Sequence, residues 1–358
     1  MHSISPIAYT PACETVRKDE ADAIRTLQDA FASSAGELAE ARGHACRAVH
    51  AKGHALLRGT LTVPGSLPAQ YAQGLFAQPG SYTVLLRWSS PPAGQLPDSI
   101  STPRAVALKV IGVPGERLDA SRPGHSQDFL LVNAPAFALP DPQSLLPARA
   151  LLPASAEGFE TGKKLLSSVL RTVEGAIEAL GGSSVKVKGI GGEPQRHPLG
   201  ETYYSQTPFL YGPYMAKFAL APVSDSLLAL RGAPLDNGDD AQREALAAHF
   251  ARQGGEWELR AQLCTDLDQM PVEDASREWP EALSPYVAVA RLAVQPQQSW
   301  DPVVSPRLED ETAFDPWNCV AAHRPLGAIN RARSEVMRTS REVRSNFNRC
   351  PIHEPPTC

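Results

Sequence analysis

Four segments in the first 133 residues alternate apolar and polar positions in the way that β-strands do. In 55–63 and 83–90 every second side chain can enter a core, and 104–112 and 128–133 repeat the pattern between loops rich in proline, glycine and serine. Three later segments carry the same signal: 214–223, 256–264 and 286–294. Because Arg87 and Ser89 are two residues apart, we expect their side chains to share one face of a strand.

Helical spacing of apolar residues marks three other segments, at 20–42, 157–182 and 328–347. In the last of these, one stripe combines apolar residues with two arginines: Ile329, Arg333, Val336, Met337, Ser340, Val343, Arg344 and Phe347. The opposite side is expected to be polar and includes Asn330, Arg331, Arg338 and Arg341. A buried guanidinium needs an anionic partner, for which a carboxylate is the natural choice.

The order of strands, a helical excursion and further strands predicts an α+β protein. An antiparallel barrel or sandwich with helices outside it fits this order best. No low-complexity tract or long linker divides the chain, so we expect one domain over 1–358. Its parts are N-terminal helices at about 18–43, a barrel at about 46–296 with a helical insertion at about 157–182, and a C-terminal segment at about 314–350.

Composition narrows the range of partners. The formal charge of −5 gives no electrostatic reason to expect nucleic acid or an anionic membrane, so a small-molecule ligand is expected instead. No window approaches eighteen consecutive apolar residues, and the N-terminus lacks the pattern of a signal peptide. Six scattered cysteines show no zinc-ligand spacing. We therefore expect a cytoplasmic protein with reduced thiols.

Five motifs, in order along the chain, resemble the catalase superfamily, and in particular its short bacterial haem proteins. They are RAVHAKG (47–53), VLLRWSS (84–90), TPRAVALKV (102–110), DFLLVNAP (128–135) and FDPWNCVAAHRPLGAINRAR (314–333). The resemblance covers nearly the whole chain. It implies an eight-stranded antiparallel β-barrel that holds a haem b group with its iron. It also implies an enzyme that acts on hydrogen peroxide or organic hydroperoxides.

The resemblance also implies a role for each matching residue. His50 would be the distal histidine, Asn133 the distal asparagine, and Ser89 the residue that holds the imidazole. Val49 would narrow the channel above the iron. Cofactor contacts would come from four arginines: Arg47, Arg87 and Arg344 at the propionates and Arg333 on the proximal side. Seven other histidines are expected to be ordinary surface or core residues: His44, His54, His125, His197, His249, His323 and His353.

One departure from the family changes the chemistry. Catalases ligate iron through a tyrosinate one helical turn after the proximal arginine, where this chain has Met337. Met337 could ligate iron weakly or pack beneath it. The sequence thus leaves open a peroxidase or catalase-like enzyme, a non-catalytic haem-binding or sensing protein, a hydroperoxide isomerase, and a structural relic without haem. It also leaves open the reducing co-substrate and whether the chain forms a homo-oligomer.

Overall fold

The computed structural model describes residues 5–91, 93–100, 102–120, 124–147, 195–236 and 238–355. Nine strands form one antiparallel sheet, in the order β5-β4-β3-β2-β1-β9-β8-β7-β6, and a further pairing of β5 with β7 closes eight of them into a barrel. The strands are β1 (Lys52–Val63), β2 (Gly80–Ser90), β3 (Ala105–Val110), β4 (Gln127–Val132), β5 (Tyr203–Tyr204), β6 (Phe209–Tyr211), β7 (Tyr214–Pro222), β8 (Gly255–Leu263) and β9 (Val287–Val294). The predicted α+β barrel is confirmed.

The barrel interior is the main hydrophobic core, and strand alternation fills it. Leu57 and Leu61 of β1 point inward beside Leu86 and Trp88 of β2, and all four are at most 1 % exposed. The register from Lys52↔Ser90 to Val63↔Gly80 sets these residues side by side. Residues between them face outward, and these form the part of the barrel surface that concerns function.

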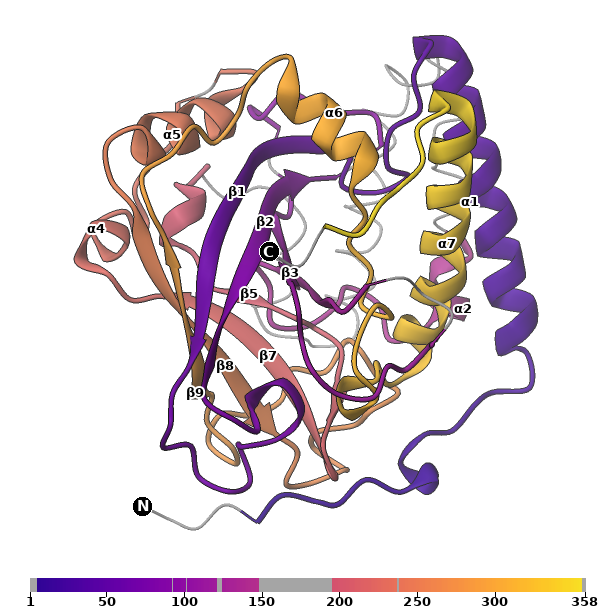
Figure 1. Cartoon of the computed structure of the whole chain (residues 1–358). Helices are drawn as coiled ribbons and strands as arrows, with labels where there is room; N and C mark the ends of the chain where they lie inside the picture. Colours follow the sequence, from indigo (N-terminus) through magenta and orange to yellow (C-terminus); the bar gives the residue numbers. More distant parts are fainter. Residues whose placement is uncertain are drawn as a thin grey trace.

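Helices surround this barrel. The longer ones are α1 (Glu20–Arg42), α5 (Ala241–Phe250), α6 (Val304–Glu311) and α7 (Ala328–Asn348), and the single turns are α2 (Pro142–Leu145) and α4 (Asp225–Leu228). Short 3-10 turns are η1 (Pro11–Cys13), η2 (Gly74–Phe76), η5 (Pro198–Gly200) and η6 (Ala321–His323). Figure 1 shows α1 and α7 lying side by side, away from the barrel strands. Among the described residues no helix is both long and apolar enough to cross a membrane.

Helix α1 shows why the N-terminal segment is helical. Alanine, leucine and glutamate dominate it, and Ala23, Leu27 and Leu38 repeat on one buried face. The helix ends at Arg42 because Gly43 takes the left-handed conformation, with φ of 68°, which suits glycine. The helical insertion expected at 157–182 lies outside the described residues.

Helix α7 begins close to the predicted position, but its polar side is less exposed than expected. Asn330 is fully buried and donates to the carbonyl oxygens of Pro208 and Leu326. Arg331 contacts the carboxylates of Glu14, Glu20 and Glu273. Phe347, which the pattern placed on the buried stripe, is 39 % exposed. The prediction of one buried and one exposed face for this helix was therefore wrong. Polar and charged residues from distant segments cover part of the side that was expected to be exposed.

Candidate functional site

The predicted site residues occupy the outward face of β2 to β4 and the segments next to it. In β2, Arg87 and Ser89 point outward and are nearly buried, whereas Trp88 between them lies in the barrel core. In β3 the outward positions are the small residues Ala105 and Ala107. The outward residues of β4 are Leu130 and Val132, which are only half-buried. Small apolar side chains on adjacent strands leave a flat wall on this face.

Three arginines from distant parts of the chain meet at Glu309. Arg47 Nη1 donates to Glu309 Oε2 at 2.5 Å, and Arg87 Nε donates to Glu309 Oε1 at 2.6 Å. Arg344, on α7, donates to the backbone carbonyl of Glu309 and to that of Thr312 at 3.1 Å. We call Arg47, Arg87, Arg344 and Glu309 the arginine clamp. It brings together the three arginines that the sequence assigned to a common role.

The clamp carries more positive than negative charge. Two guanidinium groups bond to the Glu309 carboxylate and a third bonds to its backbone carbonyl, while Arg87 Nη2 and Arg344 Nε are buried with no hydrogen-bond partner within the described part of the chain. Burial alone would raise the pKa of Glu309, but Arg87 and Arg47 outweigh it and hold that pKa below its usual value. Burial and the neighbouring Arg87 lower the pKa of Arg47. The clamp is suited to take up further negative charge.

Sequence reasoning missed Glu309, although it predicted that the buried arginines need a carboxylate. Glu309 lies in the last turn of the short helix α6, whose only buried residues are Ser305 and Glu309. Nothing in the local pattern PRLEDETAF separates Glu309 from its exposed neighbour Glu311. Only the fold shows which of these carboxylates reaches the arginines.

His50 lies in the turn just before β1, in a conformation that few residues adopt. Its φ of 53° is in the left-handed region, and its Nδ1 is buried without a hydrogen-bond partner among the described residues. Burial lowers the pKa of His50 to about 3, with smaller contributions in the same direction from Arg87 and Arg333, whereas the Ser89 backbone acts in the opposite direction. The imidazole is therefore neutral at neutral pH and has a nitrogen available. Val49, beside it, is 43 % exposed.

Ser89 lies close to the turn that carries His50, whereas the side chain of Asn133 is hydrogen-bonded to other segments. Ser89 pairs with Gly53 across the β1–β2 ladder, so it lies near the turn that carries His50. Asn133, just past β4, accepts a hydrogen bond from the backbone N–H of Arg104 at 2.8 Å and donates to Glu201 Oε1 at 3.2 Å. The amide of Asn133 is thus engaged with neighbours in this structure, and only one of its N–H bonds is left for a ligand.

On α7, Arg333 and Met337 lie one turn apart on a half-buried face. Arg333 Nη1 donates to Thr207 Oγ1 at 3.0 Å and to Asn330 Oδ1 at 3.2 Å. Burial lowers the pKa of Arg333 to about 10, and no carboxylate among the described residues forms an ion pair with it. Arg333 is therefore a second cationic position that faces a region without negative charge in the described chain.

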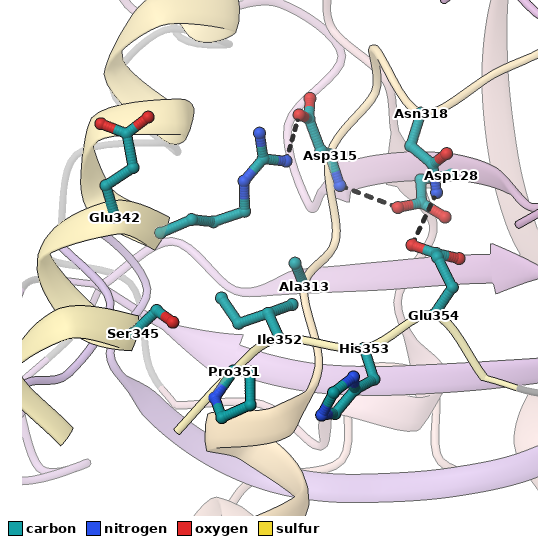
Figure 2. A pocket seen from close by; sticks show the side chains of 11 residues that line it. Asp128, Ala313, Asp315, Asn318, Glu342, Ser345, Pro351, Ile352, His353 and Glu354 are labelled. Atoms are coloured by element: carbon teal, nitrogen blue, oxygen red, sulfur yellow. Dashed lines mark hydrogen bonds and ion pairs between the residues drawn. The ribbon is translucent and has the colours of Figure 1, made fainter. Parts of the chain in front are cut away.

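Two cavities lie near the arginine clamp and helix α7. One of about 200 Å³ adjoins the arginine clamp and is lined in part by Cys46, Gly53 and Trp300. A larger one of about 420 Å³ lies between α7 and the C-terminal tail (Figure 2). Figure 2 shows Asp128, Asp315 and Glu354 on one side of it. Burial raises the pKa of Asp128 to about 7, and this larger cavity is lined by none of the residues predicted from the sequence.

Several histidines outside the site confirm their expected ordinary roles. His54 is 1 % exposed and its Nε2 lies 2.9 Å from Ser90 Oγ. His323 is fully buried, where its Nε2 accepts from the backbone N–H of Leu75 at 3.0 Å. His44 lies at the surface and contacts Asp310. Both His50 and His54 have a buried Nδ1 without a hydrogen-bond partner among the described residues, but only His54 bonds a neighbouring side chain through its other nitrogen.

Comparison with known proteins supports the fold. Neither protein-family models nor curated protein sequences give a match. Among solved structures, the chain is similar to a fungal catalase, with 17 % identity and a TM-score of 0.58 over 88 % of this chain and 63 % of that one. A bacterial catalase gives 16 % identity and a TM-score of 0.57, covering 98 % of this chain and 66 % of the other. Catalase A from Saccharomyces cerevisiae gives 15 % and 0.56, covering 98 % and 70 %.

These similarities establish a catalase-like fold for this chain. At such identities they carry no information about individual residues. The chain also spans only 63 % and 66 % of the length of the first two of these catalases. The chemistry of the site therefore has to be argued from its own side chains.

Proposed function

We propose that this chain binds haem b between the outward face of β2 to β4 and helix α7, and uses it to react with hydrogen peroxide or an organic hydroperoxide. The observation that carries the proposal is the combination of a neutral, unpartnered His50 with the positively charged arginine clamp. Each feature alone occurs in many proteins. Together they offer a proton acceptor beside a place for a planar group that carries carboxylates.

The residues fit haem at its carboxylate edge. The three clamp arginines carry one positive charge more than the carboxylates of Glu309 and the neighbouring Asp310 offset, so a propionate would find net positive charge there. The buried donors Arg87 Nη2 and Arg344 Nε would gain acceptors that they lack in the described chain. The outward residues Ala105 and Ala107 are small, and Ala107 packs in an apolar cluster that includes Phe314 and Ile111.

Bound haem would supply a redox-active iron at which a hydroperoxide can be cleaved. The role of His50 in that reaction follows from its protonation state. A neutral imidazole can take a proton from one oxygen of the peroxide and return it to the leaving oxygen. The low pKa of about 3 keeps His50 unprotonated across the whole physiological range. Val49, exposed beside it, borders the approach to the imidazole.

On the opposite side, α7 would offer Met337 and Arg333 to the cofactor. A thioether is a neutral, soft ligand that favours ferrous iron and gives little electron density to ferric iron. Arg333 has no phenolate to stabilise here and donates to Thr207 and Asn330 instead. For this reason we expect peroxide disproportionation to be slower than in a protein with a tyrosinate ligand.

A second candidate is a protein that holds haem without turning over peroxide. Two points favour it: the family resemblance implies Met337 at the position of the tyrosinate, and the amide of Asn133 is engaged with Arg104 and Glu201. In this case His50 would contact the iron or its ligand without repeated proton transfer.

The experiment that separates the two candidates is a peroxide assay on protein reconstituted with haem. Oxygen release reports disproportionation, and oxidation of a reducing dye reports peroxidase activity. Turnover of either kind, well above that of free haem at equal concentration, supports the enzyme. A protein that binds haem stoichiometrically yet reacts no faster than free haem supports the second candidate.

A further inference from the structure

We propose that Glu309 is a built-in competitor for haem, which occupies the arginine clamp in the empty protein and makes the cofactor exchangeable. The inference rests on the proposed haem function and concerns a residue that the sequence did not single out. Its basis is that the arginines assigned to the propionates already hold a carboxylate of the chain itself. The empty clamp is thereby neutralised in part, and incoming propionates must share the arginines with Glu309 or displace it.

The fit of Glu309 in the clamp is built from several segments. Its carboxylate bridges Arg47 and Arg87, and it is 9 % exposed. Gly53 provides the space, because a Cβ at residue 53 would overlap Glu309 Oε1 and come within 3.0 Å of the Trp300 ring. A carboxylate in such a close-fitting place stabilises the protein without haem, since the buried cations Arg47 and Arg87 would otherwise lack an anionic partner.

Helix α6 depends on the same contacts. It buries only Ser305 and Glu309, while three large apolar residues around it are exposed: Val303, Val304 and Leu308. Arg47 and Arg344 donate to the carbonyl groups at the end of α6, including that of Thr312 at 2.9 and 3.1 Å. The clamp therefore anchors α6. If propionates draw these arginines away, α6 loses the clamp contacts and keeps those of Asp310 with His44 and Asn348.

The charge balance sets the direction of the effect. With Glu309 and the neighbouring Asp310 the three arginines leave one positive charge for a ligand, and without Glu309 they leave two. Replacing Glu309 with glutamine keeps its size and removes the competing charge. The variant should then bind haem more tightly while its empty form becomes less stable, because the binding free energy no longer includes displacement of the carboxylate.

The test compares haem affinity and the melting temperature of the empty protein for Glu309→Gln and for Glu311→Gln. Glu311 ends the same helix and is exposed, so it is the matched control. We expect Glu309→Gln to lower the melting temperature and to slow haem transfer to excess apomyoglobin at least about tenfold, which corresponds to a tenfold tighter complex. Glu311→Gln should match the parent in both measurements. Unchanged or faster haem transfer from Glu309→Gln would overturn the inference.

A second measurement needs no variant and remains valid if Glu309→Gln folds poorly. Amide hydrogen exchange of the parent protein, with and without haem, reports on α6 directly. We expect the amides of residues 304–312 to exchange faster when haem is bound. A bound ligand usually slows amide exchange, so this would be the opposite of the general effect. Slower exchange in α6 on haem binding would contradict the inference. Failure of the parent to bind haem at all would instead overturn the proposed function, and the inference with it.

Discussion

Gly53 makes room for the carboxylate of Glu309. A side chain at residue 53 would collide with Glu309 Oε1, the oxygen that accepts from Arg87 at 2.6 Å. The glycine belongs to the RAVHAKG motif, immediately after the turn that carries His50. The motif therefore places its histidine and also leaves space for the anion that neutralises the arginines.

Replacing Gly53 with alanine should destabilise the protein through the clamp. Overpacking of a close-fitting site costs about 1–3 kcal/mol, and a loss in this range is expected on thermal unfolding. Gly53→Ala should cost much less stability when it is made in a Glu309→Ala background, because the colliding carboxylate is then gone. Gly36→Ala serves as the control, since an added Cβ there meets nothing within 4 Å and alanine favours a helix by about 0.5–1 kcal/mol. Equal losses with and without Glu309 would show that the collision is not the cause.

His50→Ala tests the distal side. The variant should retain haem, because the clamp and strand wall remain, while its reaction with peroxide slows by about two to four powers of ten, the usual contribution of a general acid–base. Stopped-flow measurement of the haem spectrum gives the rate. His44→Ala is the control, because its imidazole is 49 % exposed and contacts Asp310 at the surface. A rate in His50→Ala equal to that in His44→Ala would exclude His50 from the chemistry.

Met337→Tyr tests the proximal side. Arg333 lies one turn earlier on α7 and is a buried cation without a carboxylate partner among the described residues, so it should lower the pKa of a phenol at 337. We expect the variant to show the charge-transfer absorption of a ferric tyrosinate and to release oxygen from peroxide faster than the parent. Met337→Phe provides the ring without the hydroxyl and should do neither. A spectrum like that of Met337→Phe would mean that residue 337 does not face the iron.

His323 gives the protein a share of its sensitivity to acid. Burial lowers the pKa of His323 to about 4, below its ordinary value of 6.5, so the unfolded chain binds a proton that the folded chain does not. The contribution of the neutral His323 to the free energy of unfolding is fully present above pH 6.5. It is lost as the pH falls to about 4, which lowers that free energy by roughly 3 kcal/mol. His50, His54 and His197 shift in the same direction.

The measurement is the free energy of unfolding by denaturant between pH 4 and 7. His323→Gln should flatten its dependence on pH, whatever the effect on absolute stability. His353 is exposed, and His353→Gln should leave the slope of the parent unchanged. A slope in His323→Gln as steep as in the parent would show that His323 is already charged in the folded state.

The barrel could be predicted from the sequence because alternation is a local property. Every strand of six residues or more was recognised, and the inward set at Leu57, Leu86 and Trp88 matches the core. The short strands β5 and β6 escaped prediction, because two or three residues cannot show a period. Barrel closure through β5 could therefore not be derived from the pattern and came only with the family resemblance.

The site was less predictable because its partners are distant in sequence. Glu309 reaches Arg47 across 262 residues, and Asn133 bonds to Glu201 across 68. No periodicity reports such contacts. The clamp arginines could be proposed because three separate motifs pointed to a common ligand. The carboxylate that holds them in the empty protein, and the network that engages Asn133, required the folded chain.

The most direct test of the account is a haem titration of the purified protein followed by its absorption spectrum, with Arg344→Ala and Arg338→Ala measured in parallel. Arg344 is buried in the clamp, whereas the Arg338 side chain is 45 % exposed on the same helix. We predict a Soret band that saturates at one haem per chain for the parent and for Arg338→Ala, and much weaker binding for Arg344→Ala. No Soret shift in the parent, or equal binding in the two variants, would contradict the haem site proposed between the barrel and α7.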